Sequence, residues 1–100
     1  MPTYIVLVKL TEQGRRNLKQ TPQNIRQIMQ MAGQQGTTFK GWYLTMGPYD
    51  AVSIVEAPSD EAIASGVLSE ALRGEIESLT MRAFTLEETE NLLNQLPTRL

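Results

Sequence analysis

Four segments of the chain have the residue pattern of β-strands. They are rich in β-branched, aromatic and aliphatic side chains, which suit a pleated and largely buried surface. The segments are residues 3–10, 37–46, 49–57 and 75–84. Gly47 and Pro48, which interrupt regular structure, separate the second segment from the third. We therefore expect these two segments to form an antiparallel hairpin.

A long helix is predicted between the first and second strands. Thr21 and Pro22 form a start signal, because threonine caps helices and proline suits the first helical position. The helix is expected over residues 22–35, and Gly36 is placed to end it. Its apolar positions recur at helical spacing. They are Ile25, Ile28, Met29 and Ala32.

A second long helix is predicted between the third and fourth strands. Ser59 is placed to cap it, acidic residues follow in its first turn, and Gly74 ends it. The apolar stripe expected to face the sheet consists of Ala62, Ile63, Val67, Leu68 and Leu72. A shorter helical turn is expected after Thr11, which is a further capping residue.

The last predicted element is a helix near the carboxyl end. Thr85 and Glu88 have the spacing of a capping box, and the helix is expected to extend to about Leu96. The predicted order is strand, helix, strand, strand, helix, strand, helix. Its first six elements match the ferredoxin-like βαββαβ pattern, an α+β fold with a four-stranded antiparallel sheet. Residues 1–100 are therefore expected to form one domain with an extra C-terminal helix.

Both faces of the predicted sheet carry large apolar side chains. In this fold the helices cover one face, and the other face should be polar in a monomer. Every predicted strand nevertheless carries apolar residues at both sets of alternate positions. In the first strand one set is Tyr4, Val6, Val8 and Leu10, and the other is Ile5, Leu7 and Lys9.

An apolar second face marks an interface. We expect a homodimer in which two sheets pack face to face, with higher assemblies of such dimers as a further option. The alternative is a monomer whose C-terminal helix folds over the open face of its own sheet.

Composition excludes several kinds of partner. Apolar residues make up 41% of the chain and charged residues 20%, as in ordinary soluble domains. The net charge is -2 and no basic stripe is present, so a nucleic-acid partner is not expected. The longest apolar run, "YIVLV", is too short to span a membrane, and it lacks the flanks of a signal peptide. We expect a cytoplasmic protein.

The chain contains neither cysteine nor histidine. The commonest general base, the commonest transition-metal ligands and the thiolate nucleophile are therefore all missing. This composition excludes Ser-His and Cys-His catalysis and the usual zinc sites. No acidic loop has the spacing of a calcium site. We expect no metal and no cofactor.

Three separated stretches resemble the GYD domain family. The central one contains "GPYD", with Gly47, Tyr49 and Asp50 as the motif residues, within "KGWYLTMGPYDAVSIVEAPSDEAIA". The flanking matches are "MPTYIVLVKLTEQG" and "RAFTLEE", so the resemblance spans nearly the whole chain. It implies a ferredoxin-like domain of the dimeric α/β-barrel type, bacterial or archaeal, and it implies no particular activity.

The GPYD segment has two interpretations. As a turn, Gly47 supplies unusual backbone torsions, Pro48 restricts the open loop, and Asp50 accepts hydrogen bonds from turn amides. As a site, Tyr49 and Asp50 place a phenol beside a carboxylate at the mouth of a cavity. That pair could bind a polar ligand, or could abstract a proton if burial raised the pKa of Asp50.

Two charged pairs are expected from the strand order of this fold. Asp50 should lie near Lys9, and Arg82 should approach Glu56 across the first strand. If each pair shares a face of the sheet, both are structural ion pairs. If Arg82 is unpaired inside the barrel, it is instead a binding site for a carboxylate or phosphate.

A ligand pocket is a further hypothesis. Small and polar side chains recur along the strands, at Gly41, Thr45, Ser53, Ser78 and Thr80. With Tyr43 and Trp42 nearby, they could leave room for an aromatic or apolar molecule, unless larger neighbours fill the space. The candidate ligand-binding residues are therefore Tyr43, Thr45, Tyr49, Asp50 and Arg82.

Three functions remain open. The first is a non-enzymatic dimeric module for small-ligand binding or assembly. The second is a cofactor-free enzyme that acts on a small aromatic or carbonyl compound, although the missing histidine counts against it. The third is an interaction subunit that docks through the C-terminal helix, whose apolar face is expected to comprise Leu86, Leu92, Leu93 and Leu96.

Overall fold

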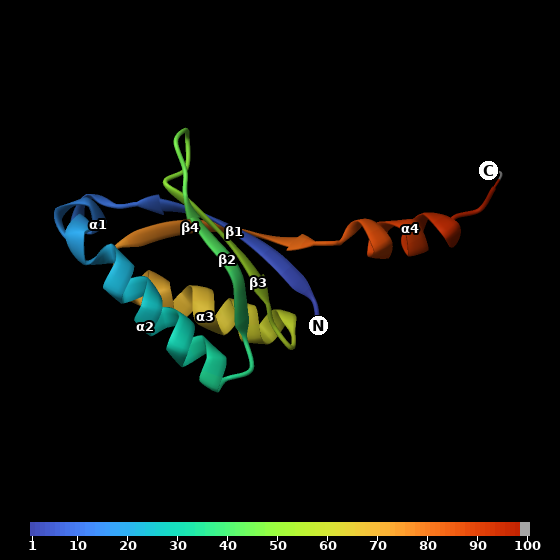
Figure 1. Ribbon diagram of the computed structural model, residues 1–100, viewed down its shortest axis with the longest axis horizontal. Coiled ribbons are helices and arrows are strands. Elements are labelled where there is room, and N and C mark those ends of the chain that lie inside the picture. Colours follow the sequence, from blue (N-terminus) through green and yellow to red (C-terminus); the bar gives the residue numbers. More distant parts are fainter. Residues whose placement is uncertain (99–100) are drawn as a thin grey trace.

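The computed structural model describes residues 1–98 and has the predicted order of elements. The four strands are β1 (Thr3–Leu10), β2 (Thr38–Leu44), β3 (Ala51–Glu56) and β4 (Ile76–Ala83). The helices are α1 (Glu12–Arg16), α2 (Thr21–Gln34), α3 (Asp60–Arg73) and α4 (Leu86–Asn94), and the 3-10 helix η1 (Leu18–Gln20) precedes α2. The fold is α+β and ferredoxin-like, as expected (Figure 1).

The strands form one antiparallel sheet in the order β2-β3-β1-β4. The register places Leu7 of β1 between Val52 of β3 and Leu79 of β4. The pairing of β2 with β3 shifts by one residue between Phe39 and Gly41. A β-bulge of this kind reverses the alternation of side chains along the strand, so the two halves of β2 follow different phases.

Most of the predicted helix signals act as expected. The hydroxyl oxygen of Ser59 accepts a hydrogen bond from Ala62 N at 3.1 Å, and Gly74 ends α3 with a φ of 74°. The prediction that Thr21 caps α2 is wrong. The turn η1 runs directly into the helix, so Thr21 is its first residue and Gln20 takes the cap position without a side-chain hydrogen bond.

Helices α2 and α3 lie against one face of the sheet, here called the inner face (Figure 1). Its central residues are buried. They are Tyr4, Val6, Ala51, Ser53 and Val55. The inner face therefore forms the core of the fold.

The opposite face of the sheet, the open face, is apolar, and no helix within residues 1–98 lies over it (Figure 1). The register aligns its side chains in rows across the strands. They are Ile5, Leu7, Tyr43, Val52, Ile54, Leu79 and Met81. Leu79 is 48% exposed and Met81 41% exposed. The expectation that both faces are apolar is confirmed.

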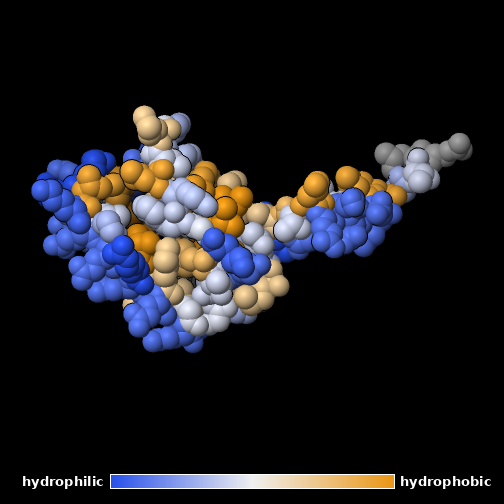
Figure 2. All heavy atoms as spheres, in the orientation of Figure 1, coloured by the Kyte–Doolittle hydropathy of each residue, from blue (hydrophilic) through white to orange (hydrophobic). Residues whose placement is uncertain are grey.

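Helix α4 does not cover the open face. It extends away from the body of the subunit, at the far right of Figure 1. Figure 2 shows hydrophobic atoms along its upper side, and Leu86 is 85% exposed. The alternative of a monomer whose C-terminal helix covers its own sheet is therefore wrong. Within residues 1–98, no helix has the length and apolar character needed to cross a membrane.

Candidate functional site

The GPYD segment closes the hairpin between β2 and β3. Thr45 N donates to Asp50 O at 2.9 Å, and the Thr45 hydroxyl donates to Tyr49 O at 2.7 Å. Gly47 has a φ of 146°, which side chains disfavour, so glycine suits this position. The hydroxyl of Thr45, a predicted ligand-binding residue, is thus engaged inside the turn.

Asp50 continues the pairing of β1 with β3. Its backbone N donates to Val8 O at 2.8 Å, and its carboxylate accepts a hydrogen bond from Leu10 N at 2.7 Å. The side chain therefore takes the place of a further backbone partner at the end of β1. Asp50 does accept from a backbone amide, as the turn interpretation expects, but this amide belongs to β1 and not to the turn.

Neither predicted ion pair forms. Lys9 lies two residues after Leu7 in β1 and so shares the open face with it. Asp50 lines a cavity on the inner face, so the sheet separates the two side chains. Arg82 pairs in register with Tyr4 on the inner face, and Glu56 pairs with Thr3 on the open face. The two expectations are wrong because the members of each pair lie on opposite faces of the sheet.

Arg82 and Glu56 instead have other partners. Arg82 donates to Thr3 O at 3.3 Å and also to Ala83 O, and its guanidinium lies 4.4 Å from the centre of the Phe84 ring. The carboxylate of Glu56 lies 3.8 Å from Lys40 Nζ. Arg82 thus takes part in cation–π packing at the end of β4 and is not among the residues that line the cavity.

The inner face also holds a hydrogen bond that fixes the start of α3. The hydroxyl of Tyr4 donates to the carboxylate of Asp60, which lies in the first turn of that helix. This hydrogen bond raises the pKa of the Tyr4 phenol, because ionised Tyr4 would lose it and would lie beside a like charge. Tyr4 therefore remains a donor and joins β1 to α3.

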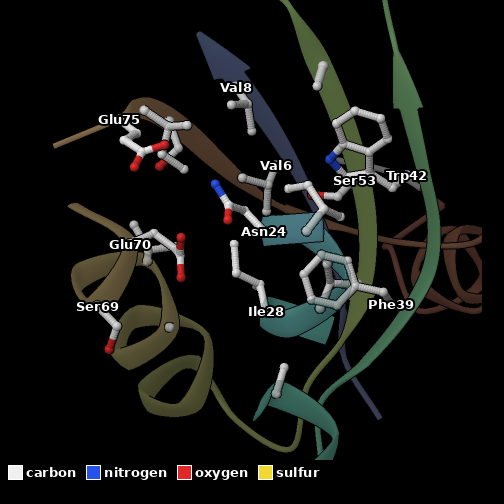
Figure 3. Close-up of a pocket in the computed structure, with 18 of the residues that line it drawn as sticks. Val6, Val8, Asn24, Ile28, Phe39, Trp42, Ser53, Ser69, Glu70 and Glu75 are labelled. Carbon is white, nitrogen blue, oxygen red and sulfur yellow. The ribbon is translucent and has the colours of Figure 1, made fainter. Parts of the chain in front are cut away.

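A cavity of about 210 Å³ lies between the inner face and helices α2 and α3. Its floor is largely apolar and is contributed by all four strands (Figure 3). The floor residues include Val6, Val8, Phe39, Trp42, Ser53 and Ser78. Small side chains at Ser53 and Ser78 leave part of the space free, so the predicted pocket exists in part.

One end of the cavity is polar. Asn24 of α2, Glu70 of α3 and Glu75, which follows α3, turn their side chains toward one another there (Figure 3). Burial raises the pKa of the Glu70 carboxyl, and the like charge of Glu75 raises it further. Arg73 opposes that shift, with Nε 3.9 Å from a Glu70 oxygen. This end therefore concentrates negative charge in a partly buried place.

The predicted ligand-binding residues are distributed differently from the expectation. Of the five, only Asp50 lines the cavity. Tyr43 lies over Gly41 on the open face and is 57% exposed. The ligand role of each of these residues stays a prediction.

Sequence reasoning missed the polar end of the cavity. Glu70 lies seven residues after Ile63, a helix spacing that places both on one side of α3, and this signal could have identified it. Leu68 and Leu72 were assigned to the inner stripe instead. They lie on the outer side of α3, where Leu72 is 90% exposed. Within residues 1–98, no cluster of acidic side chains has the composition of a metal site.

Solved structures of other proteins share the fold. The crystal structure of FFRP-DM1 has a TM-score of 0.55, with 22% identity, and the match covers 84% of this chain and 100% of that one. The crystal structure of TTHA0845 from Thermus thermophilus has a TM-score of 0.54, with 21% identity, and the match covers 85% of this chain and 95% of that one. At these identities the likeness supports the ferredoxin-like fold alone.

Closer matches come from sequence. A relative from Thermus thermophilus, the glutamine synthetase and cystathionine beta-lyase binding protein, is 34% identical over 89 residues. The match covers 88% of this chain and 94% of the relative. The family model of the GYD domain matches residues 4–93, which include the GPYD segment, strands β2, β3 and β4, and all of β1 except its first residue. The chain therefore belongs to the GYD domain family.

Proposed function

We propose that the protein is a homodimeric binding module that associates with partner proteins and has no catalytic role of its own. The open face carries the main support. Its apolar rows would be exposed in a monomer, and burying them against a second copy would remove them from water. A two-fold axis through the sheets brings the same surface of each subunit together.

Helix α4 supports the same assembly. In Figures 1 and 2, α2 and α3 lie below the sheet, and the hydrophobic side of α4 is turned to the upper side, toward which the open face also points. An interface across the open face can therefore continue along α4 of the same subunit. We propose that the leucines of α4 pack on the second copy.

The partner surface is proposed from α3. Leu68 and Leu72 are one helical turn apart on its outer side, away from both the cavity and the open face. They stay exposed in the proposed dimer. The Thermus relative is named as a protein that binds glutamine synthetase and cystathionine beta-lyase. We infer that this chain likewise binds enzymes, through this leucine pair.

Two matched substitutions separate the surfaces. Leu79→Glu places a charge in the open face, and Leu72→Glu places the same charge on the outer side of α3. Sedimentation equilibrium should show Leu79→Glu as a monomer and Leu72→Glu as a dimer. In a pull-down with purified glutamine synthetase and cystathionine beta-lyase from the source organism, Leu72→Glu should lose the captured enzyme. A dimeric Leu79→Glu variant would refute the proposed interface, and undiminished capture by Leu72→Glu would refute the partner surface.

The enzyme alternative receives less support. A general base needs a carboxylate oxygen that is free to take a proton from substrate. One of the two carboxylate oxygens of Asp50, the candidate base, already accepts a hydrogen bond from Leu10 N at the end of the sheet, so only the other oxygen could take that role. Its partner in that hypothesis, Tyr49, is not among the residues that line the cavity. The geometry thus favours binding over proton abstraction.

A further inference from the structure

The cavity under α2 and α3 has room for a ligand of a few heavy atoms. Its volume of about 210 Å³ corresponds to roughly seven water molecules at their share of liquid volume. It lies on the inner face, so the proposed dimer interface on the open face would not fill it.

The walls of the cavity suit the apolar part of a ligand. Phe39 and Trp42 of β2 bound one side, Val6 and Val8 lie on the floor, and Ile28 of α2 projects toward them (Figure 3). Water in such a space finds few hydrogen-bond partners, so an apolar group displaces it favourably. The rings of Phe39 and Trp42 also offer π-faces to an aromatic or cationic group.

The charges around the cavity are unbalanced. Among residues 1–98, three carboxylates line it, those of Asp50, Glu70 and Glu75, against the single guanidinium of Arg73. Arg73 Nε lies 3.9 Å from a Glu70 carboxylate oxygen, and the Asp50 carboxylate accepts a hydrogen bond from Leu10 N. The second carboxylate at the polar end, Glu75, adds repulsion that raises the pKa of Glu70. An anionic ligand would increase this repulsion, whereas a cation would relieve it.

A buried hydroxyl adds an independent polar contact. Ser53 is only 4% exposed and lines the floor of the cavity (Figure 3). A buried hydroxyl that opens on a cavity can find a partner there, either water or a polar group of a ligand. The floor therefore offers a hydrogen-bonding group in addition to its apolar surface.

From this arrangement we propose that the cavity binds a small primary amine with an apolar body. The ammonium group lies between Glu70 and Glu75 and donates hydrogen bonds to their carboxylates and to the side-chain oxygen of Asn24. The apolar body lies toward Phe39 and Trp42. This site is separate from the surfaces proposed for the dimer and for the partner enzyme.

Three probes of similar size test the class of ligand. They are phenethylamine, the neutral 2-phenylethanol and the anionic 3-phenylpropionate. Trp42 is the single tryptophan of the chain and lines the cavity, so its fluorescence reports binding there directly. We expect saturable quenching or a spectral shift with phenethylamine, affinity at least tenfold weaker for 2-phenylethanol, and no saturation with 3-phenylpropionate.

Variants locate the ammonium group. Glu70→Gln should weaken phenethylamine binding at least tenfold, because it removes a negative charge that faces the ammonium group. The variant should keep its fold, because burial disfavours the charged form of Glu70. Glu90→Gln, an exposed change on α4, should bind as wild type does. Ser78→Met places a larger side chain on the cavity floor and should abolish binding of every probe. This second variant tests the site if Glu70→Gln does not fold.

Two kinds of result would contradict the proposal. Absence of saturable binding by wild type would refute the site. Equal affinities for the three probes, or unchanged affinity in Glu70→Gln, would refute recognition of an ammonium group. None of these outcomes depends on the dimer, whose mass is measured separately, so the site and the proposed function can fail independently.

Discussion

At the scale of single residues, Asp50 links a turn to the sheet beneath it. The residue directly after the GPY turn places its carboxylate 2.7 Å from Leu10 N, beyond the last paired residues of β1 and β3. A charged acceptor satisfies an amide that would otherwise lose its partner at this end of β1. The motif residue thus has a structural task that does not depend on any ligand.

This role predicts a loss of stability. Asp50→Ala removes the acceptor of Leu10 N and should lower the free energy of unfolding by about 1–3 kcal/mol. Asp50→Asn keeps an oxygen that can accept the bond and should lose less. Urea unfolding at one fixed protein concentration provides the comparison, with Glu87→Ala on α4 as an exposed acidic control. Superimposable curves for Asp50→Ala and wild type would contradict the structural role.

At the scale of elements, the same local signals explain both what was predicted and what was not. Strands, helices and most caps follow from short-range periodicity and from hydrogen bonds within a few residues, such as the one from Ala62 N to Ser59. The face of the sheet on which a strand places each side chain depends instead on its pairing with neighbouring strands. The bulge between Phe39 and Gly41 places Phe39 and Trp42 on the inner face and Tyr43 on the open face.

The errors in the predicted site have the same origin. The predicted ion pairs Asp50–Lys9 and Arg82–Glu56 rest on proximity along neighbouring strands. Neither pair forms, because successive side chains of a strand point to opposite faces of the sheet. On α3, hydrophobicity alone assigned Leu68 and Leu72 to the core, although both lie outside and Glu70 lines the cavity. Hydrophobicity alone does not tell whether an apolar residue of a helix faces the sheet or the solvent.

Helix α4 carries a prediction about acid. Its capping box joins the Glu88 carboxylate to Thr85 N at 2.9 Å and the Thr85 hydroxyl to Glu88 N at 3.1 Å. The hydrogen bond from Thr85 N lowers the pKa of Glu88 in the folded helix. A depressed pKa stabilises the helix above the ordinary glutamate value of 4.5, and this contribution is lost as the pH falls through the lower, folded value.

Nuclear magnetic resonance can follow this titration. The Thr85 amide resonance should shift with an apparent pKa below 4.5, and Glu88→Gln should abolish the shift. Thr85→Ala should destabilise the start of α4 by about 1 kcal/mol, seen as faster amide exchange in its first turn. Glu87→Gln, in the same turn, should leave the Thr85 titration in place. A Thr85 resonance that titrates at or above 4.5 would contradict the capping account.

At the scale of the whole molecule, the chain is more extended than its length requires. The radius of gyration of its Cα atoms is 15.7 Å, against about 13 Å for a compact chain of this length. The protruding helix α4 accounts for this difference (Figure 1). We propose that a second copy of the chain covers both the apolar open face and the apolar side of the projecting helix α4.

Native mass spectrometry of the purified protein under gentle conditions tests this claim most directly. One chain has a mass of 11.2 kDa, so we expect a dominant species at twice that mass, or at an even multiple, that persists on dilution. The Leu79→Glu variant should fall to the mass of one chain. A wild-type spectrum dominated by the single chain at every concentration would contradict the dimer and the role proposed for the open face.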